Sequence, residues 1–518
     1  MQKNVIEYLW KTVERVPDKV AIDDTKEQVT FLQLQQSAIK VAASIRELGL
    51  RKCPVGIYVP KGAKMIQAFA GVSLSCNFYV PLDTKSPDAR IQSILQVLGA
   101  KVVITTTALK AKAENLGDYK VLVMEEMLEK DAPEINLKEY IGNQTDLDPV
   151  YSIFTSGSTG TPKGVVISHR SAIDFIDWMI DRFGIDGNRI MGNQVPFYFD
   201  VSVSDIYLMY ATGSTLVIIP EMFFSFPTDL IDFINEKKIN FVFWVPFVLI
   251  NAANVDIFSE KLPQYLEDVF FAGEVMPNRH LNYWRKYLPQ CRYVNLYGPT
   301  EITVISTYYE VDREFTDDES LPIGYACNNC DNLILVDDKD GKRAAEVNEK
   351  GELAIAGTCL ALGYFGDWEK TNKAFIQNPL NDKYREYIYL TGDVCYKNER
   401  GEIIYCGRKD SQIKHNGYRI ELGEIENAVL ASKIVDNCCV IYDHTNKKII
   451  LFYESKDEIK LVDFRKAISS HVPKYMLPSD YLWEQSLKRN QNGKIDRAYY
   501  TNKVNKQELP PPPPIHVV

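Results

Sequence analysis

Hydroxyl side chains, glycines and a lysine fill residues 155–163, directly after the apolar stretch 151–154. Gly157 and Gly160 allow positive φ, so backbone N–H groups can approach an anion. Lys163 adds a point charge suited to phosphate. A plain Ser/Gly surface turn is the alternative, but the apolar runs on both sides argue against it. The pattern predicts a polyphosphate-binding loop made of Thr155, Ser156, Gly157, Ser158, Thr159, Gly160 and Lys163.

The spacing distinguishes this loop from two better-known motifs. A Walker A loop needs a second glycine and a hydroxyl where this chain has Pro162 and Gly164. A G-x-S-x-G nucleophile elbow is excluded because Gly157-Ser158-Thr159-Gly160 has the wrong spacing. We therefore predict a phosphate-binding loop that is neither a Walker A loop nor a nucleophile elbow.

Residues 295–301, Asn-Leu-Tyr-Gly-Pro-Thr-Glu, form a second candidate site. The Gly-Pro turn follows an apolar strand and presents Tyr297, Thr300 and Glu301 at its carboxyl end, where ligands of α/β sheets gather. An aromatic ring can stack on a purine, a hydroxyl can bond phosphate, and a carboxylate can hold Mg²⁺. Asp393, after a Thr-Gly turn, offers a carboxylate for ribose hydroxyls.

Asp200 follows the aromatic residues 197–199 and precedes an alternating, strand-like stretch at 201–203. A partly buried carboxylate needs a partner, and a substrate ammonium is a natural one. A helix N-cap or an ordinary salt bridge is the alternative role for this side chain.

In this order, the motifs resemble those of the adenylate-forming superfamily, which contains acyl-CoA synthetases, luciferases and the adenylation domains of peptide synthetases. The resemblance runs from about residue 5 to about residue 500. It implies that ATP, with Mg²⁺, is split between its α and β phosphates to activate a carboxylate.

The resemblance also assigns roles to single residues. It places adenine on Tyr297, the α-phosphate on Thr300, Mg²⁺ on Glu301, and the ribose on Asp393 and Arg408. Lys494 is the implied catalytic lysine, an electrostatic clamp on the substrate carboxylate and α-phosphate. The implied ATP site also includes Gly273, Glu274, Asn295, Leu296, Gly298 and Tyr405.

Residues 407–421 are rich in charge and glycine, and Asn416-Gly417 alone predicts a solvated type I′ hairpin. The same segment resembles the family's hinge, where Asp410 absorbs a rotation between domains. Gly417 then lies where a pantetheine arm enters.

The amino-acid-activating branch of the superfamily uses the position of Asp200 for the α-amino group. Matching the family's pocket segment by segment implies a lining of Phe199, Asp200, Val201, Ser204, Trp244, Phe270, Ala272, Leu296, Val304 and Ile305. Bulky side chains and a single charge predict a small or modest apolar amino acid: Ala, D-Ala, Gly, β-Ala or one like Val.

Within the superfamily, residues 199–207 and 272–278 most resemble those of the D-alanine–carrier protein ligases. This chain departs from that group at bulky Trp244, and at Ala272, where those ligases characteristically carry a cysteine. Because no carrier-like segment follows Lys494, we expect a stand-alone enzyme serving a separate phosphopantetheinyl carrier protein. Two alternatives remain open: an acyl- or aryl-CoA ligase on the same scaffold, and a non-catalytic ATP-binding module.

The elements that position these motifs alternate along the chain. Strand-like runs at 55–59, 102–104 and 216–219 alternate with helical patterns at 31–48 and 229–237, which predicts an α/β fold with layered, largely parallel sheets. We expect a large N-terminal domain (1–409), a small, mobile α+β domain (410–506) with its own strands at 439–442 and 449–453, and an extended Pro-rich tail (507–518).

Composition excludes several classes of protein. A net charge of −10, from 59 basic and 69 acidic residues, argues against nucleic acid or an anionic membrane as the main partner. No signal peptide or spanning segment is visible, so we expect a cytoplasmic protein without membrane insertion. The 10 cysteines are then expected to be free thiols.

Overall fold

The computed structural model describes residues 2–155, 162–317, 319–339, 341–410, 412–489 and 495–505. The chain divides into two compact units. The first comprises Met1–Thr84, Leu95–Phe154 and Gly164–Lys409, and the second comprises Lys85–Ile94, Thr155–Lys163 and Asp410–Val518. Each unit is described by itself below.

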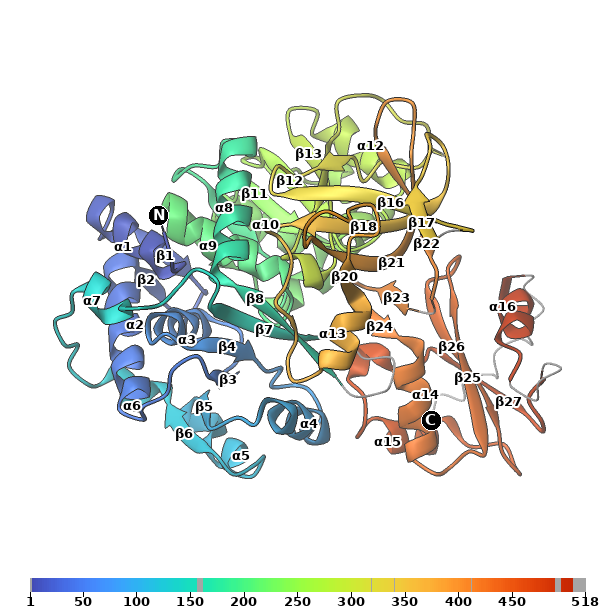
Figure 1. The fold of residues 1–518 in the computed structure, drawn as a ribbon, viewed down its shortest axis with the longest axis horizontal. Helices are drawn as coiled ribbons and strands as arrows, with labels where there is room; N and C mark the ends of the chain where they lie inside the picture. The colour runs from blue at the N-terminus through green and yellow to red at the C-terminus, as the bar shows by residue number, and fades with distance from the viewer. Residues whose placement is uncertain are drawn as a thin grey trace. The chain divides into compact units, whose positions relative to one another are not determined.

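The first unit contains three sheets with helices packed on them, so the predicted layered α/β fold is confirmed (Figure 1). The largest sheet has the strand order β15-β14-β13-β12-β11-β9-β10-β1-β2. Its strands are β1 (Val20–Asp23), β2 (Gln28–Thr30), β9 (Ile190–Asn193), β10 (Thr215–Ile218), β11 (Phe241–Trp244), β12 (Asp268–Ala272), β13 (Arg292–Tyr297), β14 (Thr307–Glu310) and β15 (Tyr325–Ala326). The inner strands run parallel, and β11 and β12 are buried along their whole length, as expected for strands covered on both faces.

The second sheet has the order β19-β8-β7-β4-β3-β5-β6. Its strands are β3 (Pro54–Tyr58), β4 (Phe78–Pro81), β5 (Val102–Thr105), β6 (Lys120–Val123), β7 (Pro149–Thr155), β8 (Lys163–Ser168) and β19 (Gly363–Tyr364). The strands predicted at 55–59 and 102–104 are therefore present, and the strand before the predicted phosphate loop is β7.

The third sheet is antiparallel, with the order β17-β16-β18-β21-β20 and with β22 paired to β21. Its strands are β16 (Cys330–Asp338), β17 (Gly341–Ala344), β18 (Gly351–Gly357), β20 (Phe375–Gln377), β21 (Tyr387–Lys397) and β22 (Ile403–Arg408).

Helices of the first unit pack on these sheets. They are α1 (Ile6–Arg15), α2 (Phe31–Arg46), α3 (Ala63–Leu74), α5 (Lys110–Glu114), α6 (Met124–Leu128), α7 (Leu137–Ile141), α8 (His169–Phe183), α9 (Val201–Thr212), α10 (Pro227–Glu236), α11 (Pro246–Asn254), α12 (Asn278–Tyr287) and α13 (Trp368–Ala374), while α4 (Asp88–Leu98) is divided between the units. Local sequence sets several of their ends. Thr30 and Gln33 form a capping box that starts α2, and Pro227 and Pro246 occupy first-turn positions of α10 and α11.

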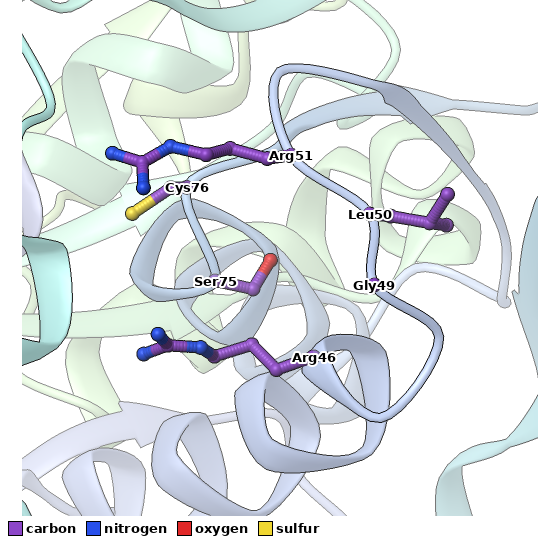
Figure 2. A pocket seen from close by; sticks show the side chains of 6 residues that line it. All are labelled: Arg46, Gly49, Leu50, Arg51, Ser75 and Cys76. Carbon is purple, nitrogen blue, oxygen red and sulfur yellow. The ribbon is translucent and has the colours of Figure 1, made fainter.

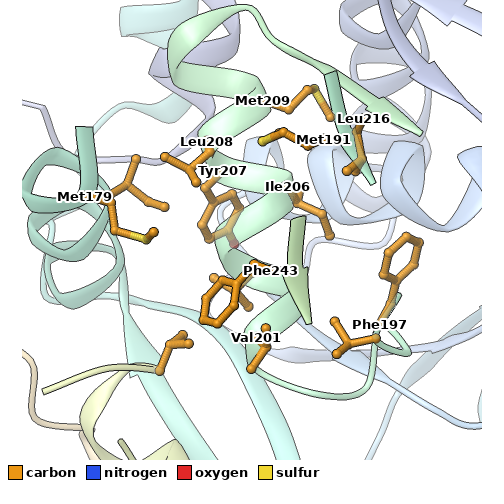
Figure 3. Close-up of a cluster of buried hydrophobic side chains, with 14 of the residues drawn as sticks. Met179, Met191, Phe197, Val201, Ile206, Tyr207, Leu208, Met209, Leu216 and Phe243 are labelled. Atoms are coloured by element: carbon orange, nitrogen blue, oxygen red, sulfur yellow. The ribbon is translucent and has the colours of Figure 1, made fainter. Parts of the chain in front are cut away.

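The prediction of a strand-like stretch after Asp200 is wrong, because these residues begin helix α9. This helix is buried on nearly all sides: Tyr207, Leu208 and Met209 point to different sides of it and belong to one buried hydrophobic cluster, which also includes Met191 of β9 and Leu216 of β10 (Figure 3). A fully buried helix has no polar stripe, so a short apolar alternation does not distinguish it from a strand.

The second unit has a hairpin of β23 (Gln412–His415) and β24 (Tyr418–Glu421) and a sheet of β25 (Asn437–Asp443), β26 (Lys448–Glu454) and β27 (Asp480–Glu484). Helices α14 (Leu422–Ala431), α15 (Leu461–Ile468) and α16 (Arg497–Asn505) accompany them. Asn416 and Gly417 both have positive φ (52° and 84°) between β23 and β24, which confirms the predicted type I′ turn.

All 10 cysteines lie within the described residues and are free thiols, as predicted. Over that same part of the chain, no helix is long and apolar enough to cross a membrane.

Candidate functional site

Four residues predicted to hold the nucleoside lie together, although they come from distant parts of the chain. The antiparallel pairing of β21 and β22 sets Asp393 opposite Arg408. The Arg408 guanidinium donates to one oxygen of the Asp393 carboxylate (2.8 Å), and the hydroxyl of Tyr297, at the end of β13, donates to the other. The Tyr405 ring lies with its centroid 6.4 Å from that of Tyr297. The structure therefore assembles an aromatic, carboxylate and guanidinium cluster.

A bulge in β21 aims the Asp393 carboxylate. The register with β18 shifts between Leu390 and Val394, and Gly392 within it has a φ of 74°, which favours glycine. The Thr391 hydroxyl donates to the Leu353 carbonyl (2.7 Å) and accepts from the backbone N–H of Asp393 (3.0 Å). These bonds hold Asp393 at the turn without using its carboxylate.

The hydrogen-bonding groups of this cluster suit a diol ligand. Burial raises the pKa of Tyr297 well above its usual range, and the Asp393 carboxylate raises it further, so the phenol remains a donor. Tyr297 and Arg408 each fill one acceptor direction on the carboxylate, which has about four. Asp393 therefore retains capacity for two ribose hydroxyls.

Thr300 and Glu301 begin the short helix η4 (Thr300–Ile302), in the loop that joins β13 to β14. Glu301 is fully buried, and its carboxylate accepts a hydrogen bond from the Tyr364 hydroxyl of β19 (2.9 Å). Carboxylate oxygens are ligands of Mg²⁺, and the Tyr364 hydroxyl orients this carboxylate, which fits the Mg²⁺ role implied for Glu301.

The residues predicted around the substrate ammonium lie at the start of α9. Asp200 is the residue before the helix, and its side chain makes no capping hydrogen bond, so the N-cap alternative is wrong. Asp200 and Ser204 are four residues apart and share one helix face. Ser204 is fully buried, and its hydroxyl has no partner among the described residues. Such a group needs a ligand or a water molecule.

Tyr151 of β7 also lies near this carboxylate, and the motifs did not identify it. Burial is the main cause that raises the pKa of Tyr151, and the charge of Asp200 contributes. The phenol is fully buried and has no partner within the described part of the chain. The site therefore presents two buried hydroxyls close to one carboxylate.

Strand register places the predicted walls of the pocket on two different faces of the sheet. Phe270 and Ala272 are two residues apart on β12, so their side chains point to the same face of the sheet. Leu296 of β13 lies opposite Ala272 and shares that face. Trp244 lies opposite Phe271 and therefore points to the other face. Its indole N–H donates to the Gly192 carbonyl (2.8 Å), and its ring packs edge-on against Phe224. A role for Trp244 in the pocket remains a prediction.

The remaining predicted residues of the first unit lie on or after β12 and β13, or at the start of α9. Gly273 follows β12 with a φ of 102°, and Glu274 after it is half-buried. The Asn295 side-chain amide donates to the Pro322 carbonyl (2.8 Å), which is a structural use of that group. Phe199 and Val201 flank Asp200, and Val304 and Ile305 are buried in the loop after Glu301.

Part of the predicted site lies outside the described residues, namely Ser156, Gly157, Ser158, Thr159, Gly160 and Lys494. The described residues that flank the phosphate loop are Thr155, at the end of β7, and Lys163, at the start of β8. The Thr155 hydroxyl is buried and bonds no other described residue. In the second unit, the exposed Asp410 accepts from the Gln412 backbone N–H (3.1 Å).

A pocket elsewhere in the first unit is not part of this site. It has a volume of about 220 Å³ and lies where α2 and α3 end, lined by Arg46, Gly49, Leu50, Arg51, Ser75 and Cys76 (Figure 2). The negative dipole ends of two helices meet there, so its arginines have a structural explanation. It is distant in sequence from every motif described above.

Sequence and structure comparisons agree with these observations. Residues 9–365 match the family described as AMP-binding enzyme. The chain is 32% identical over 494 residues to zwittermicin A synthase ZmaJ of Bacillus cereus, covering 94% of this chain and 92% of that protein. It is also 32% identical over 518 residues to a D-alanine–D-alanyl carrier protein ligase of Bacillus cytotoxicus, covering 96% and 99%.

The fold is shared with a solved adenylation domain. The structure of AlmE from Vibrio cholerae, in complex with glycyl-adenosine-5'-phosphate, superposes with a TM-score of 0.84 at 20% identity and covers 98% of each chain. At that identity the similarity is one of fold.

Proposed function

Because the chain belongs to the AMP-binding enzyme family and is an adenylate-forming ligase, we propose that it activates a small or modest apolar amino acid. Candidates are Ala, D-Ala, Gly, β-Ala and a residue like Val. A carboxylate oxygen of the amino acid attacks the α-phosphorus of ATP, the α–β phosphoanhydride bond breaks, and pyrophosphate leaves. The product is an aminoacyl-adenylate.

In the second step, the phosphopantetheine thiolate of a separate carrier protein attacks the acyl carbonyl, and AMP leaves with the bonding electron pair. The named activity of the D-alanyl carrier protein ligase relative supports this step. Gly417 is the proposed entry point of the pantetheine arm, and Asp410 the proposed hinge between the domains 1–409 and 410–506.

Each residue of the site has a distinct task in this proposal. Tyr297 stacks on adenine, Asp393 accepts the ribose hydroxyls, and Arg408 fixes the Asp393 carboxylate. Thr300 donates to the α-phosphate. Glu301 would hold Mg²⁺, which supplies charge neutralisation on the phosphates when bound. Lys494 stabilises the charge that develops on the reacting oxygens.

The observation that carries the amino-acid assignment is the placement of Asp200. Its carboxylate precedes α9 without capping it and lies near two buried hydroxyls, those of Tyr151 and Ser204. A carboxylate complements the charge of an α-ammonium group, and the two buried hydroxyls beside it add polar groups to the same site.

Amino-acid-dependent exchange of labelled pyrophosphate into ATP tests this function. The substrates to compare are the proteinogenic amino acids, D-Ala and β-Ala. We expect exchange with one small apolar amino acid and its loss in Asp200→Ala, while Asp181→Ala, an exposed aspartate on α8, retains it.

The rival function makes different predictions in the same assay. Exchange with plain acids and thioester formation with free CoA, both insensitive to Asp200→Ala, would favour an acyl- or aryl-CoA ligase. No exchange with any amino acid would contradict the proposed activation of an amino acid.

A further inference from the structure

The loop between β13 and β14 reverses direction through two residues with unusual backbone angles. Thr303 has a φ of 58° and Val304 a φ of 74°. Both are β-branched, and such residues rarely adopt positive φ. The backbone N–H of Ile305 donates to the Thr303 carbonyl (3.0 Å), so Val304 is the central residue of a γ-turn of the strained, positive-φ form.

The surrounding chain holds this γ-turn on three sides. The Thr303 hydroxyl donates to the Cys359 carbonyl (2.7 Å), and the backbone N–H of Ala361 donates to the Glu301 carbonyl (2.9 Å). The backbone N–H of Ser306 donates to the Tyr297 carbonyl (2.8 Å) and closes the loop. Strained turns persist where neighbours over-determine them, and they cluster at functional sites.

Gly298 provides the space into which the turn packs. A Cβ at this position would lie 2.3 Å from the Val304 carbonyl oxygen and 2.8 Å from the Ile305 Cα, so no other residue fits without movement of the turn. The glycine of the nucleotide motif and the γ-turn are therefore packed directly against each other.

Resting on the proposed function, we infer that Thr303 is a positioning residue that sets amino-acid selectivity. Val304 and Ile305, predicted to line the amino-acid pocket, follow it directly. The Thr303 hydroxyl ties the turn to the Cys359 carbonyl at 2.7 Å, whereas a second side-chain contact, from the Cys330 thiol to the Ile305 carbonyl, is long at 3.9 Å. Loss of the Thr303–Cys359 bond lets the γ-turn relax toward negative φ and moves both side chains.

The nucleotide side of the loop has a separate support. Glu301 is held through its own carbonyl by Ala361 and through its carboxylate by Tyr364. Neither bond uses the Thr303 hydroxyl. A change at Thr303 should therefore act on the amino acid more than on ATP.

Thr303→Val tests this inference because it removes the hydroxyl and keeps the shape and the β-branch. Thr303→Ser restores the hydroxyl. Thr307→Val is the matched control, since Thr307 is fully buried on β14 and its hydroxyl has no partner among the described residues. Pyrophosphate exchange measured against each substrate gives separate KM values for the amino acid and for ATP.

We expect Thr303→Val to raise the amino-acid KM about tenfold and to reduce discrimination against a homologue with one more methylene group, whose exclusion is a matter of pocket shape. The ATP KM should change by less than about twofold. Thr303→Ser and Thr307→Val should behave as the wild type. If Thr303→Val does not fold, Thr303→Ala gives the same comparison.

Two results would overturn the inference: unchanged selectivity in Thr303→Val, or equal rises of both KM values that Thr303→Ser does not rescue. Either can be distinguished from failure of the proposed function, because that failure is absence of amino-acid-dependent exchange in the wild type.

Discussion

The Tyr364 hydroxyl donates to the fully buried Glu301 carboxylate at 2.9 Å, across 63 residues of sequence. The contact joins β19 to the loop after β13, and so links the second sheet of the first unit to the largest one. It orients the carboxylate that we propose as the Mg²⁺ ligand.

Tyr364→Phe removes this donor and keeps the ring. A buried acceptor that loses its donor costs about 1–3 kcal/mol of stability. The Glu301 carboxylate can reduce this cost by rotating toward another group, which would move it from its orientation in the wild type. We expect a higher Mg²⁺ concentration for half-maximal pyrophosphate exchange and a roughly tenfold lower kcat. Tyr119→Phe, whose hydroxyl donates to the Ala113 carbonyl (2.6 Å), is the control. An unchanged Mg²⁺ titration would show that Tyr364 has no such role.

Asp393→Asn should weaken ATP binding and also destabilise the first unit. The substitution removes the carboxylate charge that faces the Arg408 guanidinium, whose side chain is 13% exposed. Breaking a buried pair from one side costs about 3–5 kcal/mol. We expect a raised ATP KM, an unchanged amino-acid KM and a lower unfolding temperature.

The matched control for that change is Asp338→Asn. Asp338 pairs with Arg343 at 3.7 Å on the surface, with its side chain 54% exposed. Exposed pairs contribute about 0–1 kcal/mol, so its unfolding temperature should stay close to that of the wild type. Equal effects of the two substitutions on stability and ATP binding would contradict the assignment of Asp393.

Asp205 should make stability depend on pH. This α9 residue is 1% exposed and accepts from the Asn193 side-chain amide (2.8 Å). Burial raises its pKa to about 7, against the opposing effects of Asn193 and the charge of Lys61. Between pH 4 and 7, the unfolded chain releases a proton that the folded protein keeps, so stability falls as pH rises through this window.

The slope is at most about 1.4 kcal/mol per pH unit. Asp205→Asn keeps an amide oxygen as the acceptor and does not titrate. We therefore expect the wild type to lose stability relative to Asp205→Asn from pH 4 to 7, and the difference to be constant above pH 7. Denaturant unfolding at several pH values measures this, and parallel curves for the two proteins would argue against a raised pKa.

Lys494→Ala should separate the two proposed half-reactions. Its ammonium stabilises charge in the adenylation step, so pyrophosphate exchange should fall by a factor of about 100 or more. Transfer from a preformed aminoacyl-adenylate to a carrier thiol should be spared. Equal loss of both half-reactions would contradict this division.

Local pattern was sufficient for several strands of the first unit and for the turn between β23 and β24. Apolar runs bounded by turn residues predicted β3, β5, β7 and β10 correctly, because a strand that is buried on both faces must be apolar throughout. The Asn416-Gly417 dipeptide predicted its turn because few other residues tolerate two successive positive φ angles. The order of the motifs predicted the family, which the matched residues 9–365 confirm.

The sequence pattern did not predict secondary structure where full burial removes the polar positions that distinguish a helix from a strand. Helix α9 is apolar on nearly every side, so its first residues looked like a strand. The side of the sheet on which Trp244 lies depends on the register between β11 and β12, which no local spacing contains.

The sequence by itself determined which chemical groups the chain carries and the local turns that present them. Only the tertiary structure decided which groups meet: Asp393 with Tyr297 and Arg408, Glu301 with Tyr364, and Thr303 with the Cys359 carbonyl. The reason is physical. Turn and strand preferences act over a few residues, whereas these partners are brought together by sheet register and core packing, which depend on the whole chain at once.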